Sequence, residues 1–169
     1  MPINIHSIER RKMKKIILIF IVLLTAQLKA QDKKENIVLF YFGATSCGPC
    51  NETVTINNIK KIKNEFSKVH QDYNVKYVMV CLDQDIKEGL EFIGKYGYWD
   101  EISIGSHYNN ELVMSYLDKT KIPGVPHIII FHDEYEKPST PVIKTRQALV
   151  DLVGSGQIDD WVKNKYSLK

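Results

Sequence analysis

The chain reads IVLFYFGATSCGPC from Ile37 to Cys50, an apolar run that leads into two cysteines separated by two residues. The segment that follows has apolar residues at helical spacing, so Cys47 is expected at the N-terminus of a helix. Unpaired N–H groups and the positive end of the helix dipole stabilise a thiolate there. Pro49 suits the first helical turn, and Cys50 lies one turn on, near enough to close a disulfide with Cys47. The spacing predicts reversible dithiol–disulfide exchange, with Cys47 as the nucleophile and Cys50 as the resolving cysteine.

Two other uses of paired cysteines are excluded by the rest of the chain. A zinc site needs a second pair of ligands. The candidates, His127 and His132, are five residues apart on an expected strand, so they face opposite sides of it. Haem attachment needs a histidine directly after the second cysteine, where this chain has Asn51. We therefore expect no metal site and no cofactor other than the redox-active disulfide Cys47–Cys50.

Residues 1–30 have the features of a targeting segment. Basic residues precede the apolar stretch 16–24, and a small residue comes just before Gln31, the expected cleavage position. The apolar stretch would span only about 14 Å as a helix, against about 30 Å for the hydrocarbon core of a bilayer. We expect a cleaved signal peptide, with Met13 as an alternative start, followed by one domain over residues 31–169. An uncleaved membrane anchor is the alternative; the protein is expected to be exported, and periplasmic if bacterial.

Charge and cysteine content narrow the function classes. The formal charge of +3 arises in the first 30 residues, which hold six of the 23 Lys and Arg residues but one of the 20 Asp and Glu residues. The remaining chain is faintly acidic, which gives no electrostatic basis for binding nucleic acid. Three cysteines in an exported chain fit an active pair and one spare better than a scaffold of structural disulfides. The length suffices for one core, and we expect a monomer.

The apolar pattern beyond the cysteines predicts alternating strands and helices. Apolar residues at helical spacing predict one helix from Pro49 to about Val69. The continuous apolar run 77–82 predicts a buried parallel strand. The run 127–131 predicts a late strand that forms a hairpin with 142–145. The other expected elements are a helix containing residues 86–93, a short strand at 101–104, a helix at 110–117 and a terminal helix at 157–166, with residues 146–153 ambiguous.

This order of elements, together with two motifs, resembles the thioredoxin superfamily over residues 36–166. The motifs are FGATSCGPC at residues 42–50 and GVPH at residues 124–127. The resemblance implies an α/β thioredoxin fold, which is a central mixed β-sheet flanked by helices. An insertion between Cys81 and Pro126, together with the export signal, is similar to the extracytoplasmic thioredoxin-like thiol–disulfide oxidoreductases.

The resemblance also assigns roles to residues beside the cysteines. In that family the proline that opens the late strand is cis and faces the cysteine pair, which implies a cis Val125-Pro126 bond here. Val125 would then offer backbone groups to an extended substrate segment. Gly48 and Pro49, with these two residues, are expected to bind substrate and shape the active site. Gly-Pro between the cysteines resembles the reducing end of the superfamily, so the implied partners are protein disulfides and, in a periplasm, a membrane electron donor.

Three departures from the family pattern leave the mechanism and the subfamily open. Glu52 comes one place earlier after the second cysteine than the Glu that is common in the extracytoplasmic branch, and the proline that follows it there is absent. Tyr41 stands where thioredoxins have a buried acid that moves the proton of the second cysteine, and tyrosine is a poor base near neutral pH. Ser46 stands where they usually have Trp. The alternatives that remain are a thiol peroxidase and a non-enzymatic copper-handling or thiol-tethered module that uses the two cysteines and His127.

Other chemically notable side chains have simpler explanations. Cys81 lies in the middle of an apolar strand, so it is expected to be an inert buried thiol. Tyr96, Tyr98 and Trp99 are expected to cap the core, because aromatic residues are ordinary core material. His127 is expected to be a packed or edge residue.

Overall fold

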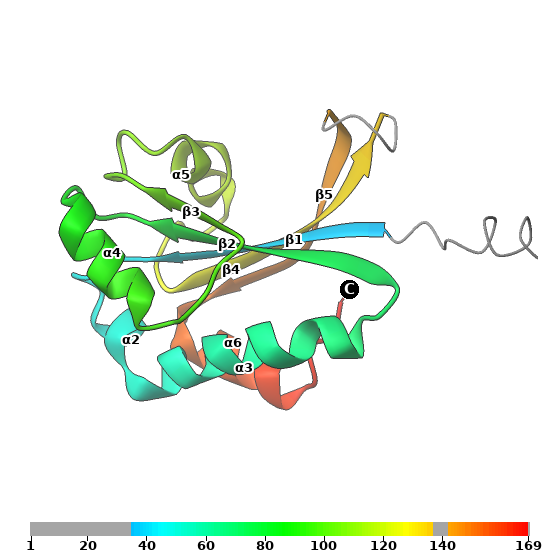
Figure 1. Ribbon diagram of the computed structural model, residues 1–169, viewed down its shortest axis with the longest axis horizontal. Coiled ribbons are helices and arrows are strands. Elements are labelled where there is room, and N and C mark those ends of the chain that lie inside the picture. The colour runs from blue at the N-terminus through cyan, green and yellow to red at the C-terminus, as the bar shows by residue number, and fades with distance from the viewer. Residues whose placement is uncertain (1–34, 137–141, 169) are drawn as a thin grey trace, which may run out of the picture. The chain divides into compact units, whose positions relative to one another are not determined.

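A computed structural model describes residues 35–136 and 142–168 of the chain. The expected leader, residues 1–30, lies outside the described residues. The folded unit is built on a five-stranded sheet with the order β3-β2-β1-β4-β5 (Figure 1). Its strands are β1 (Glu35–Gly43), β2 (Tyr73–Cys81), β3 (Glu101–Ile104), β4 (His127–Tyr135) and β5 (Ile143–Val153).

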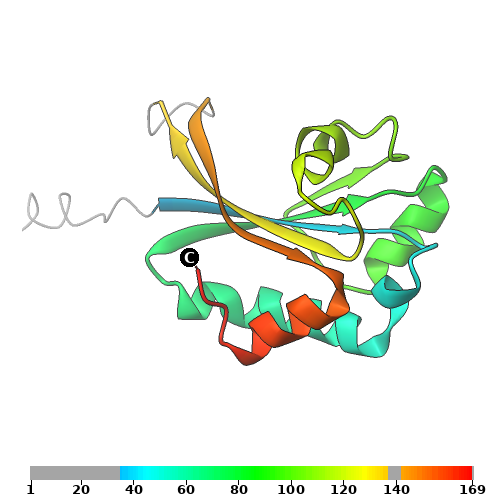
Figure 2. The same cartoon turned by 180° about the vertical axis from the view of Figure 1, so that it is seen from behind.

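The sheet is mixed, as the resemblance implied. β1 pairs in parallel with β2, and β2 with β3, whereas β4 runs antiparallel to both β1 and β5. Helices lie on both faces: α3 and α6 cover one face and α5 the other, as the two opposite views show (Figures 1 and 2). The helices are α2 (Gly48–Asn51), α3 (Thr53–Val69), α4 (Ile86–Gly94), α5 (Glu111–Ser115), the 3-10 helix η1 (Leu117–Lys119) and α6 (Gly154–Lys163).

β1 is buried on both faces, which explains its continuous apolar sequence. Successive side chains of a strand point to opposite faces, so this strand contributes to two clusters. Tyr41 and its alternate neighbours pack with α3, α4 and α6, and Phe40 and its alternate neighbours pack with α5 and η1. The two sets are Ile37, Leu39 and Tyr41 on one side and Val38, Phe40 and Phe42 on the other.

Four elements have boundaries that differ from the sequence expectation. The helix expected from Pro49 to Val69 is interrupted at Glu52, whose extended backbone (ψ 138°) ends α2 and precedes α3. The ambiguous stretch 146–153 continues β5, because it pairs along β4. The terminal helix begins earlier, at Gly154, and ends at Lys163 rather than at residue 166. The short helix α5 is also briefer than the expected 110–117.

Strand pairing brings three separate chain segments to one end of the sheet. Gly43, the last residue of β1, pairs with Cys81, the last residue of β2. Phe42 pairs with His127, the first residue of β4. The turn after β1, the turn after β2 and the loop before β4 therefore meet at this end. The cysteine pair follows β1 directly and lies here as well.

Candidate active site

Cys47 and Cys50 form a disulfide across the first turn of α2, with their Cα atoms 5.2 Å apart. The bond between the two residues, expected from their spacing, is thus confirmed. The Cys47 N–H donates to the carbonyl of Ala44 (3.2 Å), which closes the turn that follows β1. Cys47 then occupies the N-cap position of α2, with Pro49 in the first helical turn. This is the strand-to-helix junction that the sequence predicted.

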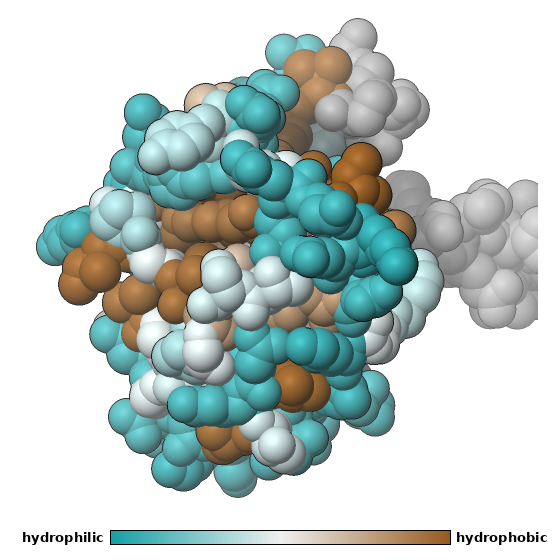
Figure 3. All heavy atoms as spheres, turned by 90° about the vertical axis from the view of Figure 1, so that its left-hand side faces the viewer, coloured by the Kyte–Doolittle hydropathy of each residue, from teal (hydrophilic) through white to brown (hydrophobic). Residues whose placement is uncertain are grey.

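The two sulfur atoms differ in exposure and in hydrogen bonding. Cys47 is partly exposed, whereas Cys50 is fully buried. The Cys50 N–H donates to Cys47 Sγ at 3.1 Å, a contact that stabilises negative charge on that sulfur. Gly48 and Pro49 are exposed, and α2 lies on the side of the folded unit seen in Figure 3, where apolar and polar patches alternate. Cys47 is the sulfur that a substrate disulfide can reach.

Val125 and Pro126 reach the same end of the sheet from the loop before β4. The Val125-Pro126 peptide bond is cis, which confirms the expectation from the resemblance. Val125 is partly exposed, and Pro126 is buried with its carbonyl accepting from the Gly154 N–H (2.8 Å). Their expected role in substrate binding stays a prediction.

His127 is fully buried, and both of its ring nitrogens have partners. Nδ1 lies 3.1 Å from the carbonyl of Gly124, and Nε2 lies 2.6 Å from Oδ1 of Asp151. It is therefore a packed residue, as expected. A copper site formed with the two cysteines would have to break one of these contacts.

On the Cys50 side of the site, aromatic side chains pack into a cluster that the sequence did not predict. The Tyr96 hydroxyl donates to the Cys50 carbonyl (2.5 Å) and lies 2.9 Å from the Tyr41 hydroxyl. Since Tyr96 has a single hydroxyl proton, Tyr41 is the donor to Tyr96. Burial, then the neighbouring Tyr96, raises the pKa of Tyr41 well above its usual value. Tyr41 is therefore a hydrogen-bond donor at neutral pH and does not act there as a base.

Trp99 also belongs to this aromatic cluster. Of the three aromatic residues that were expected to cap the core, two are buried and one is exposed. The Trp99 ring stacks on the Tyr41 ring with centroids 6.1 Å apart. Tyr96 and Trp99 are buried, so the expectation is confirmed for them. Tyr98 is 82% exposed, and that expectation was wrong. The chain turns outward between its two buried neighbours, and Gly97, with φ 80°, supplies the backbone conformation for that turn.

Asp83 is the main residue that the sequence reasoning missed. Its buried carboxylate accepts hydrogen bonds from the Thr45 N–H (3.1 and 3.0 Å to the two oxygens) and from the Thr45 hydroxyl (2.5 Å). It thereby holds the turn that leads to Cys47. The available signal was an acidic residue two positions after the buried strand that ends at Cys81, because that strand runs parallel to β1 and ends beside it.

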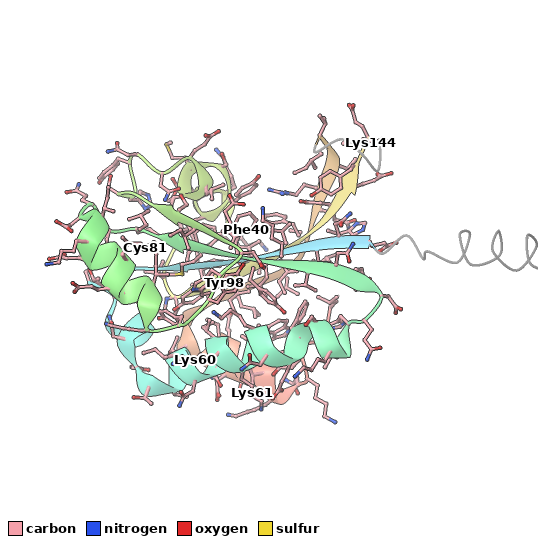
Figure 4. The ribbon with its side chains drawn as sticks, in the orientation of Figure 1. Phe40, Lys60, Lys61, Cys81, Tyr98 and Lys144 are labelled. Atoms are coloured by element: carbon pink, nitrogen blue, oxygen red, sulfur yellow. A yellow bond between two sulfur atoms is a disulfide. The ribbon has the colours of Figure 1, made fainter. Side chains whose placement is uncertain are left out.

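Cys81 donates its thiol hydrogen to Asp83 (2.8 Å) and lies on β2 at the α4 end of the sheet (Figure 4). The thiol is fully buried. Burial, then the hydrogen bond to Asp83, raises its pKa to about 12. A thiol that keeps its proton is a poor nucleophile, which supports the interpretation of Cys81 as inert.

Asn51 is a second residue with an unpredicted contact to the turn. Its side-chain amide donates to the carbonyls of Thr45 (2.9 Å) and Cys47 (2.8 Å), and its oxygen accepts from Lys95 Nζ (2.7 Å). No local sequence signal marks Lys95 for this contact. The contact exists because the end of α4 lies beside the end of α2.

Within residues 35–136 and 142–168, no three His, Cys, Asp or Glu side chains are grouped so that they could hold a metal ion. In the same part of the chain, no helix combines the length and the apolar composition needed to cross a membrane.

The chain is similar to known proteins in sequence and in structure. A family model described as thioredoxin-like matches residues 35–136. One similar structure is a putative thiol:disulfide interchange protein DsbE from Chlorobium tepidum, 13% identical with a TM-score of 0.47, covering 80% of this chain and 84% of that one. A second is a thiol:disulfide interchange protein from Bacteroides sp., 21% identical with a TM-score of 0.45, covering 77% and 73%. A third is StoA from Bacillus subtilis, 19% identical with a TM-score of 0.40, covering 77% and 84%. No curated protein matches the sequence.

Proposed function

The chain belongs to the thioredoxin-like family, and we propose that it is an exported thiol–disulfide oxidoreductase that reduces protein disulfides through Cys47 and Cys50. The observation that carries this proposal is the asymmetry of the pair. One sulfur is partly exposed and accepts a backbone hydrogen bond, and the other is buried directly behind it. In this arrangement the partly exposed sulfur can attack a substrate disulfide, and the buried sulfur is close enough to resolve the mixed disulfide that forms.

The reaction begins with the reduced protein. The Cys47 thiolate attacks one sulfur of a substrate disulfide, forms a mixed disulfide and releases the first substrate thiolate. Cys50, as a thiolate, then attacks Cys47 Sγ and releases the second substrate thiolate, which leaves Cys47–Cys50 oxidised. Two electrons pass from the protein to the substrate. A reductant must return them, and for an exported protein in a periplasm we propose a membrane electron donor.

Proton transfer in the second step does not use a carboxylate on β1. Tyr41 occupies that position and keeps its proton, so the Cys50 proton leaves to water or to another base. Val125 and Pro126 lie at the same end of the sheet and are proposed to receive the substrate chain beside Cys47.

Single cysteine substitutions test the assignment. We expect Cys47→Ser to abolish reduction of insulin disulfides, because it removes the attacking sulfur. Cys50→Ser should accumulate a mixed disulfide that non-reducing electrophoresis and mass spectrometry detect. Cys81→Ser is the control and should keep its activity. Alkylation of the reduced protein that modifies Cys50 before Cys47 would reverse the two roles.

Two measurements test the direction and the location. The reduction potential of the pair should lie nearer to about −270 mV, typical of a reductant, than to about −120 mV, typical of a strong oxidant. A value near the second figure would mean that the protein oxidises its substrates. Expression of the full chain in a bacterium, followed by fractionation and mass measurement, tests export and cleavage before Gln31.

A further inference from the structure

The helix that carries the cysteines is short. α2 has four residues, and Glu52, with its extended backbone, separates it from the 17-residue α3. The dipole effect of a helix comes from aligned peptide groups, so the peptides of α3 are not in line behind Cys47. The continuous helix expected from the sequence would have stabilised the thiolate more strongly. A positive charge from another part of the fold can therefore contribute to stabilising the Cys47 thiolate.

Lys95, at the end of α4, brings a positive charge to this turn through Asn51. The Lys95 ammonium group donates to Asn51 Oδ1 (2.7 Å), and Asn51 Nδ2 donates to the carbonyls of Thr45 (2.9 Å) and Cys47 (2.8 Å). An ammonium group can only donate and a carbonyl can only accept. An amide is thus the side-chain group that satisfies both sides, and Lys95 fixes which way the amide points.

The position of Lys95 is itself defined by the core. Its Nζ lies over the Phe92 ring, 5.5 Å from the centroid, a favourable cation–π arrangement. Phe92 is fully buried and packs closely on Gly43, where a Cβ would lie 3.1 Å from the ring. The ammonium group is therefore positioned relative to the end of β1, although its side chain is exposed.

The charged groups around the turn have opposite signs. Asp83 reaches it from the end of β2 through Thr45, and an anion there disfavours a thiolate at Cys47. Glu52, exposed after α2, acts in the same direction. Lys95 is the cation that reaches the turn from α4, and it acts in the opposite direction.

We propose that Asn51 and Lys95 are positioning residues for the thiol chemistry of Cys47. Asn51 holds the carbonyls on both sides of Ser46, Lys95 orients Asn51, and the ammonium charge stabilises the Cys47 thiolate. The pair thereby supplies part of the stabilisation that the interrupted helix does not. This inference rests on the proposed role of Cys47 as nucleophile.

The test is the pH profile of Cys47 alkylation by iodoacetamide in the reduced Cys50→Ser protein, with Cys81 protected by burial. Lys95→Met should raise the apparent pKa of Cys47 and reduce the alkylation rate below that pKa by about threefold, as expected for one exposed charge contact. Lys95→Arg keeps the charge and the donors and should restore the profile. Lys87→Met removes one exposed charge from the first turn of α4 and should change the rate by less than about 1.5-fold, because distant exposed charges are screened.

Substitution of Asn51 tests the coupling between the two residues. Asn51→Ala frees the ammonium group from the turn, so adding Lys95→Met to Asn51→Ala should have less effect than Lys95→Met alone. Asn51→Asp puts a negative charge at the turn and should raise the apparent pKa of Cys47 further than either variant. Thermal unfolding of the oxidised proteins checks that each variant folds.

Two results would overturn the inference: an unchanged Cys47 pH profile in Lys95→Met, or equal changes in Lys95→Met and Lys87→Met. A threefold effect that persists fully without the Asn51 amide would also remove Asn51 from the proposal. These outcomes are separate from failure of the proposed function, because alkylation needs no disulfide substrate. A protein that reduces no disulfide would still report the pKa of Cys47.

Discussion

Cys47 lies in a partly exposed turn held by polar side chains, whereas Cys50, three residues later, is buried in a core cluster that contains aromatic rings. On the Cys47 side, a carboxylate from the turn after β2 and an amide supported by an ammonium group bind the backbone of the turn. On the Cys50 side, two tyrosine hydroxyls in series bind a backbone carbonyl. Charged groups contact the turn beside Cys47, the sulfur that we propose attacks the substrate, whereas the contacts beside Cys50 are made by uncharged tyrosine hydroxyls. The fold therefore surrounds the two cysteines with different kinds of side chain, charged and amide groups beside Cys47 and tyrosine hydroxyls beside Cys50.

Removal of Asp83 should have the largest effect on the Cys47 side. Asp83→Ala leaves the Thr45 N–H and the buried Cys81 thiol without their acceptor, so we expect a loss of about 3 kcal/mol in the free energy of unfolding. Asp85→Ala is a matched control two residues away. It removes the N-cap of α4, which accepts from the N–H groups of Lys87 and Glu88, and should cost about 1 kcal/mol.

Urea denaturation of the oxidised proteins measures both losses. If Asp83→Ala lowers the free energy of unfolding no more than Asp85→Ala does, Asp83 does not hold the turn. The proposed difference between the surroundings of Cys47 and Cys50 would then lose one of its two polar contacts.

The next largest expected effect is the pH dependence of stability that the Cys81 thiol causes. Burial raises the pKa of its thiol to about 12 from an ordinary value of 9.0, so above pH 9 the folded state binds more protons than the unfolded state. Its contribution to stability is therefore complete below pH 9 and is lost as pH rises towards 12. The free energy of unfolding of the protein with Cys81, relative to that of the Cys81→Ser variant, should fall by about 1 kcal/mol between pH 8 and pH 10.

Urea unfolding in a background of Cys47→Ser and Cys50→Ser measures this difference without thiol exchange. A difference that does not depend on pH would show that the Cys81 thiol is not shielded as its burial indicates.

Tyr41 gives the smallest expected effect, on the Cys50 side. Tyr41→Phe removes one hydroxyl-to-hydroxyl bond, and Tyr96 keeps its bond to the Cys50 carbonyl. We expect a loss of about 0.5 kcal/mol in stability, at the low end for one hydrogen bond, and only a slight change in the turnover rate. Tyr98→Phe alters an exposed hydroxyl and is the control, with no expected change in either quantity.

Pre-steady-state decay of the mixed disulfide across pH is the decisive measurement for Tyr41. A loss of a hundredfold or more in Tyr41→Phe, about 2.7 kcal/mol of barrier, would mean that the hydroxyl carries proton transfer. Tyr41→Asp should speed resolution near neutral pH, at some loss of stability from burying a charge.

The strands were predictable to different degrees, for a physical reason. β1 from residue 37 and β2 from residue 78 are buried on both faces and read as continuous apolar runs, so these parts of the strands were identified from the sequence alone. β5 is an edge strand with largely exposed residues, and the pairing with β4 defines it. Its second half therefore looked ambiguous, since mixed polar and apolar residues fit several structures. The interruption at Glu52 had no sequence signal either, because neither Gly nor Pro marks it.

The sequence by itself determined the redox pair and its place after a buried strand. Those features depend on an apolar run and on a separation of three residues, which are local. The groups that surround the pair were decided by tertiary structure, because they come from distant parts of the chain. Asp83 lies 38 residues from Thr45, Lys95 lies 44 residues from Asn51, and Tyr96 lies 46 residues from Cys50. Parallel pairing of β1 with β2 and the packing of α4 against the end of the sheet bring these side chains to the cysteines, and no local pattern encodes such proximity.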